Sequence, residues 1–263
     1  MVFFFVYFWI KLLKKIVLLF FLFVVLASCT KPKGATISSL AFETNGYKAM
    51  GKDKKLLFLD SINTFSNSLK NDSLNRKFLF DLSSEYYYLS ESSKSLAVCK
   101  KVLILSEQAK DSMAIAKSFY YIGDTYEVKQ KDSAYYYYHQ AEKLYRLLNN
   151  KRMIGKMLFN KAYVLFYEGN FLESEILLSK ALQLLKNSED KKLLFSSCTL
   201  MGSNLSRLEE YNNAEKYYLL AKGVLSDLLE NDIEFDKNNN YKISVSVNLS
   251  EVYRKTAQYD KAI

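Results

Sequence analysis

Proline and glycine are scarce in this sequence. Its 263 residues include 1 proline and 8 glycines. Proteins built from strands and tight turns need more of both, because these two residues form most of the turns between strands. The remaining composition is rich in lysine, leucine, glutamate and alanine, which are good helix formers. The composition therefore predicts an all-helical protein.

Histidine is nearly absent, which excludes many kinds of active site. The chain has one, His139, so almost every Ser-His, Cys-His and zinc arrangement is removed. We expect His139 to lie partly exposed on a helix. The sequence also has no GxGxxG motif and no phosphate-binding loop. We therefore predict no catalytic residue, no metal site and no cofactor, and a protein that is not an enzyme.

The charge of the chain is unevenly balanced but not clustered. The formal net charge is +9, and three of the positive charges, Lys11, Lys14 and Lys15, lie close to the N-terminus. The rest of the surplus is spread along the sequence, which is typical of solvated helix faces. A basic surface for nucleic acid is the weaker alternative, and we predict no nucleic-acid partner.

The N-terminal residues have the organisation of an export signal. Lysines 11, 14 and 15 precede an unbroken apolar run of ten residues, Ile16 to Val25, and Leu26-Ala27-Ser28-Cys29 follows. Ten apolar residues suit the hydrophobic region of a signal peptide and are too few for a membrane span, which needs about 20. An uncleaved signal anchor is the alternative, and in both cases the remainder faces away from the cytoplasm.

Leu26-Ala27-Ser28-Cys29 resembles the lipobox of bacterial lipoproteins. The resemblance implies that residues 1–28 are a lipoprotein signal peptide and that Cys29 carries a lipid anchor to the membrane. No acidic residue follows Cys29 directly, which favours a periplasm-facing lipoprotein. Residues 29–52 contain the single proline and three of the glycines, so we predict a flexible tether there.

The remainder of the chain repeats a pattern of two helices. Each first helix has a small residue at its middle, and each second helix begins with a small residue, followed four residues later by a large one and three residues after that by alanine. The +4 and +3 steps place these residues on one helical face. The small residues of the first helices are Gly123, Ala162, Gly202 and Ser250. The residues of the second helices are Ala134, Tyr138 and Ala141, then Ser174, Leu178 and Ala181, then Ala214, Tyr218 and Ala221, and finally Ala262.

This pattern resembles the tetratricopeptide repeat (TPR). A degenerate copy, with Ser83, Ser95 and Cys99 at the same places, precedes the four clearer copies, and residues 53–69 look like one more helix in front. The resemblance implies an all-α, right-handed superhelical solenoid of antiparallel helix pairs over residues 53–263. Ala134, Ser174 and Ala214 lie 40 residues apart, whereas the standard repeat has about 34, so the similarity is to long-repeat bacterial variants.

Two further expectations follow from the repeat register. Cys99 and Cys198 fall at apolar positions three repeats apart, too distant for a disulfide, and we predict two buried free thiols. The sequence stops where the second helix of the last repeat begins. We therefore expect a truncated array whose last full helix has an uncovered apolar face at Val245, Leu249 and Val252.

The resemblance also locates a surface for a partner. In this family the first helices of successive repeats line a concave groove. The predicted groove residues are Tyr120, Asp124, Glu127, Phe159, Tyr163, Phe166, Thr199, Ser203 and Ser206. They suit a helix or an extended peptide with an apolar centre; the alternative is that they are ordinary surface and packing residues.

The function that these observations favour is a non-enzymatic scaffold that binds a protein or peptide and is anchored outside the cytoplasm. The alternative is the sensory ectodomain of a larger signalling protein, a histidine kinase or DNA-binding regulator, whose C-terminal part follows residue 263.

Overall fold

The computed structural model describes residue 42, residues 44–236 and residues 240–262. The predicted signal peptide, Cys29 and most of the predicted tether lie outside these residues. The described chain is helical, as predicted. Its elements are α3 (Asn45–Lys48), α4 (Lys52–Ser66), α5 (Ser73–Tyr88), α6 (Ser92–Gln108), α7 (Ser112–Tyr126), α8 (Lys131–Leu147), α9 (Lys151–Tyr167), α10 (Phe171–Leu185), α11 (Lys191–Arg207), α12 (Tyr211–Asn231), η1 (Ile233–Asp236), α13 (Asn240–Lys255) and η2 (Tyr259–Lys261).

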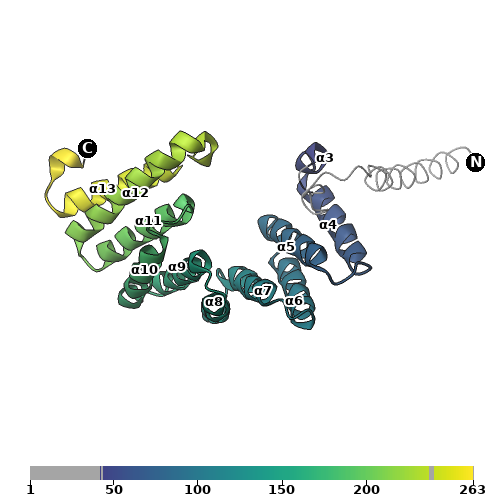
Figure 1. Ribbon diagram of the computed structural model, residues 1–263. Helices are drawn as coiled ribbons and strands as arrows, with labels where there is room; N and C mark the ends of the chain where they lie inside the picture. The colour runs from purple at the N-terminus through teal and green to yellow at the C-terminus, as the bar shows by residue number, and fades with distance from the viewer. Residues whose placement is uncertain (1–41, 43, 237–239, 263) are drawn as a thin grey trace, which may run out of the picture.

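The helices stack as pairs into a curved array (Figure 1). The pairs are α5 with α6, α7 with α8, α9 with α10, and α11 with α12, as the repeat pattern predicted. In Figure 1 the array bends into an arch, with α5, α7, α9 and α11 nearer the hollow and α6, α8 and α10 on its outer side. We call the α5–α7–α9–α11 side the inner surface.

The first helix of each pair begins with the same cap. The residue before the helix accepts a hydrogen bond through its side chain from the backbone N–H three residues later, at N–O distances of 2.8–3.1 Å. Such caps pair a backbone donor that the helix leaves free. They recur at intervals of 39 or 40 residues, so they mark the repeat as regularly as the packing residues do. The capping residues are Asp72, Asp111, Asn150 and Asp190.

Most of the turns inside the pairs share a residue in the left-handed conformation. In four turns the residue seven positions after the small residue of the first helix has a positive φ, which ends the helix sharply. Only one of them is a glycine, Gly169. In the α7–α8 pair the small residues of the two helices, Gly123 and Ala134, are one position closer in sequence than in the other pairs, and the turn lacks this conformation. The four residues are Ser90, Gly169, Glu209 and Ala257.

Close contact between a small and a large residue fixes the distance between paired helices. A Cβ atom added to Gly123 would lie 2.6 Å from the ring of Tyr138, and one added to Gly202 would lie 2.7 Å from the ring of Tyr218. Both rings are buried. The predicted function of the small residues, which is to let the tyrosine enter the space between the helices, is confirmed.

Replacing Gly123 with alanine should therefore destabilise the protein. The added methyl group cannot be accommodated without moving a buried tyrosine, which typically costs about 1–3 kcal/mol. Gly223 on α12 is the matched control, because a Cβ there meets nothing within 4 Å. Gly223→Ala should gain about 0.5–1 kcal/mol from helix propensity. Urea unfolding of both variants measures the two effects, and a Gly123→Ala protein as stable as the wild type would contradict the packing argument.

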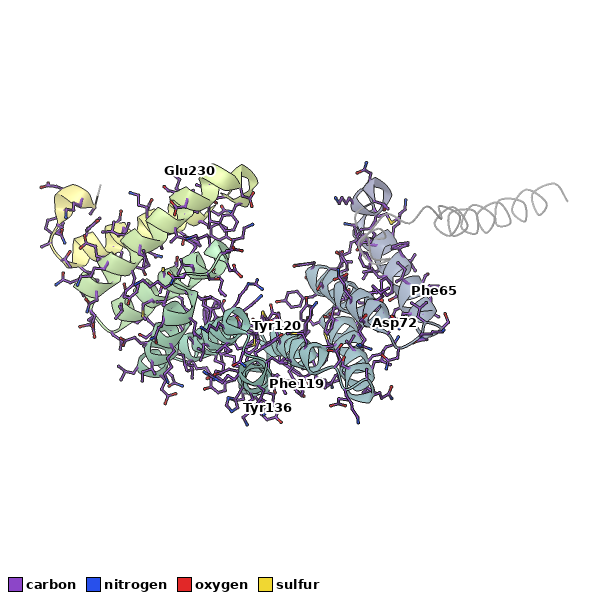
Figure 2. All side chains as sticks on the ribbon, viewed as in Figure 1. Phe65, Asp72, Phe119, Tyr120, Tyr136 and Glu230 are labelled. Carbon is purple, nitrogen blue, oxygen red and sulfur yellow. The ribbon has the colours of Figure 1, made fainter. Side chains whose placement is uncertain are left out.

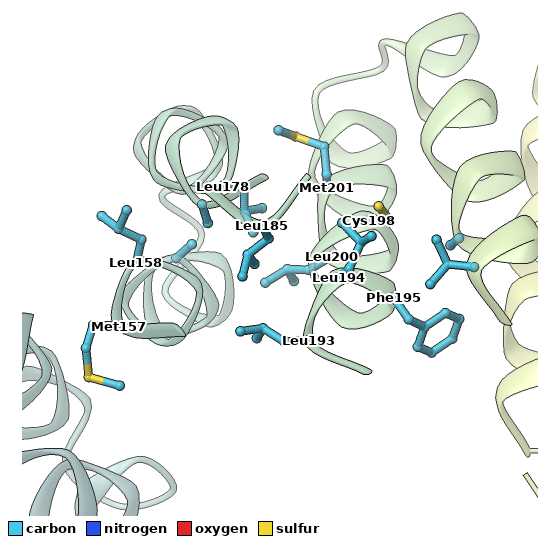
Figure 3. Packing of buried hydrophobic residues seen from close by; sticks show 14 of the residues in the cluster. Met157, Leu158, Leu178, Leu185, Leu193, Leu194, Phe195, Cys198, Leu200 and Met201 are labelled. Atoms are coloured by element: carbon cyan, nitrogen blue, oxygen red, sulfur yellow. The ribbon is translucent and has the colours of Figure 1, made fainter. Parts of the chain in front are cut away.

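The apolar core runs continuously along the array from Ala116 to Val252, and a second cluster lies at the N-terminal end. Figure 3 shows part of the longer core, in which Cys198 on α11 lies among leucines from α11 and from the preceding pair. Cys99 and Cys198 are both buried and free, as predicted. Burial raises the pKa of the Cys99 thiol to about 11 and that of Cys198 to about 12.

One end of the predicted tether is not a tether. Residues 45–48 form the short helix α3, and Tyr47 is buried, with its hydroxyl donating to Glu85 Oε2 on α5 at 2.6 Å. Phe42 also packs beside Phe78 on α5. The packed array therefore begins before residue 53. Glycine content suggested flexibility here, but Gly51 precedes α4 as its N-cap residue.

The expected uncovered face on α13 is also wrong. Val245, Leu249 and Val252 are buried, because α13 packs this face against the preceding pair α11–α12. The exposed large hydrophobic residues of α13 are Tyr241, Ile243 and Val247. The sequence pattern predicted the apolar stripe of α13 correctly, but we expected a helix beyond the end of the sequence to cover it, and the preceding pair covers it instead.

Candidate functional site on the inner surface

Eight of the nine predicted groove residues lie on α7, α9 and α11, the ninth, Glu127, is the C-cap residue of α7, and all nine are partly exposed. The repeat register places them in three rows along the inner surface, each with one residue from each helix. The first row also includes Phe80 on α5, the second Ser84 and the third Tyr87. The rows are Tyr120, Phe159 and Thr199; Asp124, Tyr163 and Ser203; and Glu127, Phe166 and Ser206. In Figure 2, Tyr120 lies toward the hollow of the arch, and Tyr136 on α8 lies on its outer side.

An acidic centre occupies the middle of this surface. The Tyr138 hydroxyl, from the second helix of the pair, lies 2.8 Å from Asp124 Oδ1 and 2.8 Å from Glu127 Oε2. A phenol has one proton to donate. The two carboxyl groups therefore compete for the hydroxyl proton of Tyr138 when both are ionised. Protonation of one of them relieves this competition, because the protonated carboxyl group can donate to the phenol oxygen while the phenol donates to the other.

The surroundings of these carboxyl groups favour the same protonation. Burial raises the pKa of Asp124 to about 7, and the nearby Glu127 adds to the rise, while hydrogen bonds from Tyr138 and Tyr120 and the charge of Lys156 oppose it. Burial also raises the pKa of Glu127, against the hydrogen bond from Tyr138. Near neutral pH the centre can thus gain or lose a proton.

Tyrosine rings from neighbouring helices surround the acidic centre. Tyr87 comes from the end of α5, in the row of Glu127, and its pKa is raised by burial and by the charges of Asp124 and Glu127. Tyr163 on α9 has a pKa raised by burial, by Tyr167 and by Glu127. The rings of Tyr163 and Tyr167 lie 4.6 Å apart. The site therefore draws on three successive helix pairs.

Tyr87 and Tyr167 were missing from the sequence prediction. Tyr87 could have been found, because the register of Ser83 puts it in the row of Glu127. Tyr167 lies one position beyond the row of Phe166 at the end of α9, and only the structure shows that its ring packs on Tyr163.

Lysines on the inner surface lie over aromatic rings of the preceding pair. Lys156 Nζ on α9 lies 4.5 Å from the ring centre of Tyr120 on α7. Lys117 Nζ on α7 lies 4.3 Å from that of Phe80 on α5. The two lysines occupy the same place in their repeats, so this cation–π contact is repeated between successive inner helices. Ser196 stands at that place on α11, and the contact is not continued there.

On α11 two of the predicted groove residues already use their hydroxyl groups in hydrogen bonds within the repeat. Thr199 and Ser203 donate to backbone carbonyls of their own helix, and Ser203 also contacts the hydroxyl of Tyr218 at 3.1 Å. These hydroxyl groups therefore already have partners within the repeat. Ser206 differs, because its Oγ is buried without a hydrogen-bond partner among the described residues. The carboxyl groups of the described inner surface that lack an ion pair lie at α7.

The remainder of the described chain adds no second site. His139 on α8 is partly exposed, as predicted, and burial and the charge of Lys161 lower its pKa. Within the described ranges, no group of three His, Cys, Asp or Glu side chains is placed to hold a metal ion. No helix among these residues is long and apolar enough to cross a membrane.

Comparison with solved structures shows the fold. BtubC (BKLC) from P. vanneervenii matches with a TM-score of 0.70 at 13% identity, over 81% of this chain and 87% of BtubC. A Rap protein complexed with Competence and Sporulation Factor matches with a TM-score of 0.59 at 19% identity, over 78% of this chain and 55% of that chain. NprR in complex with its cognate peptide NprX matches with a TM-score of 0.54 at 15% identity, over 80% and 58%.

The fold is a TPR-like solenoid. The chain spans somewhat more than half the length of the Rap and NprR chains that it matches. No protein-family model and no curated protein sequence matches it.

The protonation of Asp124 gives a measurable pH dependence of stability. Its folded-state pKa of about 7 lies above the ordinary value of 3.8, so the folded state disfavours the ionised form. Stability is therefore lost as the pH rises from about 4 to 7. Asp124→Asn removes this loss while its amide oxygen can still accept from Tyr138. The variant should gain stability over the wild type at pH 8 relative to pH 4.5 in urea unfolding. An equal difference at both pH values would show that Asp124 titrates normally.

Proposed function

We propose that this protein is a non-enzymatic scaffold that binds a peptide or protein segment along its inner surface. The observation that carries this proposal is that the three rows of the inner surface place partly exposed tyrosines, phenylalanines and carboxyl groups on the consecutive inner helices α7 and α9. Aromatic side chains contribute large contact areas at low entropic cost. The carboxyl groups beside them add polar selectivity.

The solved structures support the same function. A Rap protein is known in complex with Competence and Sporulation Factor, and NprR in complex with its cognate peptide NprX. Those complexes concern those proteins, and the likeness to this chain is one of fold. They support the proposal because a curved stack of helix pairs can accommodate a peptide ligand.

Alanine at Tyr163 and Phe166 should weaken peptide binding. Both residues lie at the aromatic centre of the inner surface on α9 and are partly exposed, and truncating an aromatic contact of this kind costs about 1–3 kcal/mol, roughly a 5- to 150-fold loss of affinity. Peptides selected from a random display library against the purified protein serve as ligands, with affinity measured by fluorescence polarisation. The control is Tyr136→Ala, a tyrosine that is 57% exposed on the outer side.

Equal affinities for the double variant and the wild type, with an unchanged helical circular dichroism spectrum, would exclude this part of the inner surface as the binding site. A loss of affinity in Tyr136→Ala as large as that in the double variant would also exclude it. The control separates a specific groove from general stickiness of exposed tyrosines.

We further propose that the scaffold is a periplasm-facing lipoprotein held at the membrane through Cys29. The lysine-containing leader, the ten-residue apolar run and Leu26-Ala27-Ser28-Cys29 support this anchoring. More than one acyl chain at the N-terminus gives stable attachment, whereas a single chain is marginal.

Metabolic labelling tests the anchor. Cells that express the protein with a labelled fatty acid should incorporate label, and Cys29→Ala should abolish it because the acceptor thiol is gone. Cys198→Ala is the control and should keep the label, since that thiol is buried in the core. Label retained in Cys29→Ala would exclude lipidation at this residue.

The sensory-ectodomain alternative uses the same inner surface. In this alternative the described helices would bind a ligand in the same way. The difference is that the anchored array would be joined to a kinase or DNA-binding module. Reading the gene beyond codon 263 distinguishes the two.

A further inference from the structure

We propose that the inner surface between α5, α7 and α9 binds a lysine or arginine side chain of the peptide segment, seated on Glu127 between Tyr87 and Tyr163. This inference rests on the proposed function and names the chemistry of its ligand. Three features of the described structure support it: a carboxyl group without an ion pair, two tyrosine rings with no cation over them, and a cation–ring contact that recurs elsewhere in the array.

Glu127 has no cationic partner within the part of the chain that the structure describes. It accepts one hydrogen bond, from Tyr138, through Oε2, and no lysine or arginine lies within ion-pair distance. Glu142 on α8, another buried carboxylate, has two cationic partners. Lys161 Nζ lies 2.7 Å from Glu142 Oε2, and Arg146 Nη2 lies 2.6 Å from Glu142 Oε1. A half-buried carboxylate without a cation is costly to ionise, and a cation from a ligand would remove that cost.

Asp124 shares the Tyr138 hydroxyl with Glu127, and its ionised form adds negative charge to the same site. The charge of Lys156 opposes the rise in the pKa of Asp124, but Lys156 lies over the ring of Tyr120 and makes no ion pair with Asp124. The site therefore has two carboxyl groups and one partly engaged lysine. An acidic ligand group would be repelled here, and an apolar one would leave Glu127 without a partner.

Tyr87 and Tyr163 supply aromatic faces beside Glu127. Tyr87 is 40% exposed, and both rings lie close enough to Glu127 for its charge to raise their pKa. Within the described chain no lysine or arginine covers either ring, whereas Lys131 already lies over Tyr167, 5.5 Å from its centre. A cation beside a carboxylate and over a tyrosine face gains from both contacts.

The array already uses this geometry between its own helices. Lys117 lies over Phe80, and Lys156 lies over Tyr120, one inner helix further on. These contacts show that the spacing of the inner helices brings a cationic side chain to the aromatic residues of the neighbouring helix. In the row of Tyr87 and Glu127 the rings and the carboxylate are present and the cation is absent.

Selection and a matched peptide pair test the inference. A random decapeptide display library is panned against the purified protein, and the selected peptides should be enriched in lysine or arginine relative to the input. The best binder and its Lys→Gln or Arg→Gln version are then measured against wild type and Glu127→Gln. The wild type should prefer the basic peptide by about tenfold or more, and Glu127→Gln should reduce this preference to about twofold or less.

Glu168→Gln is the control variant, because Glu168 is an exposed acid that directly follows α9 as its C-cap residue. It removes the same charge and should keep the preference. If Glu127→Gln does not fold, Tyr87→Ala replaces it in the test. Wild type and Glu168→Gln should then prefer the basic peptide, and Tyr87→Ala should lose that preference.

The possible failures are distinguishable. Selected peptides that bind without enrichment in basic residues, or a preference unchanged by Glu127→Gln, would overturn this inference and leave the proposed function standing. A library that yields no binder at all would overturn the proposed function as well.

Discussion

The contact between a glycine on one helix and a tyrosine on its partner is the constraint on which the rest of this structure depends. Without a side chain at Gly123, α7 and α8 approach closely enough for Tyr138 to lie buried between them. The ring then passes through the pair, and its hydroxyl emerges beside Asp124 and Glu127 on the inner surface. Tyr218 does the same at Gly202 and reaches Ser203. In these two pairs the packing that holds the helices together therefore also determines which polar groups on the inner helix are already engaged.

Polar contacts join one pair to the next. The ion pair between Lys161 on α9 and Glu142 on α8 is buried on both sides, and Arg152 on α9 binds the cap residue Asp190 that begins α11. The buried pair contributes little net stability, but breaking it is expensive, so it favours one register between α8 and α9 more than it strengthens the array. Arg152 is exposed, and its pair with Asp190 contributes less. The apolar core is continuous from Ala116 onward, so curvature and core are set by the same succession of interfaces.

Much of this fold was predictable because the repeat pattern reports directly on packing: Ala134, Tyr138 and Ala141 are buried where the +4 and +3 spacing placed them. The capping residues, such as Asp111 and Asp190, were equally regular in the sequence, but a polar residue before a helix is common and only the hydrogen bond distinguishes it. The burial of α3 and the inward face of α13 were not predictable, since an apolar stripe does not say which neighbour will cover it. For the site, the sequence located the inner residues of α7, α9 and α11. It could not show that Tyr138, a packing residue by every pattern, would bring two carboxyl groups together.

The inner surface changes character along the array, and the change follows from which residues the helices themselves satisfy. On α11, Thr199 and Ser203 bond to their own backbone, so a ligand gains little by contacting them. On α9 the row residues are Phe159, Tyr163 and Phe166, which offer area without charge. On α7 they are two carboxyl groups that share one phenol and have no cation within ion-pair distance among the described residues. A ligand lying along the array would therefore be recognised by charge at α7 and by shape at α9. Its orientation would be fixed by this asymmetry, because reversing it would place the basic residue against rings and hydroxyls that already have partners.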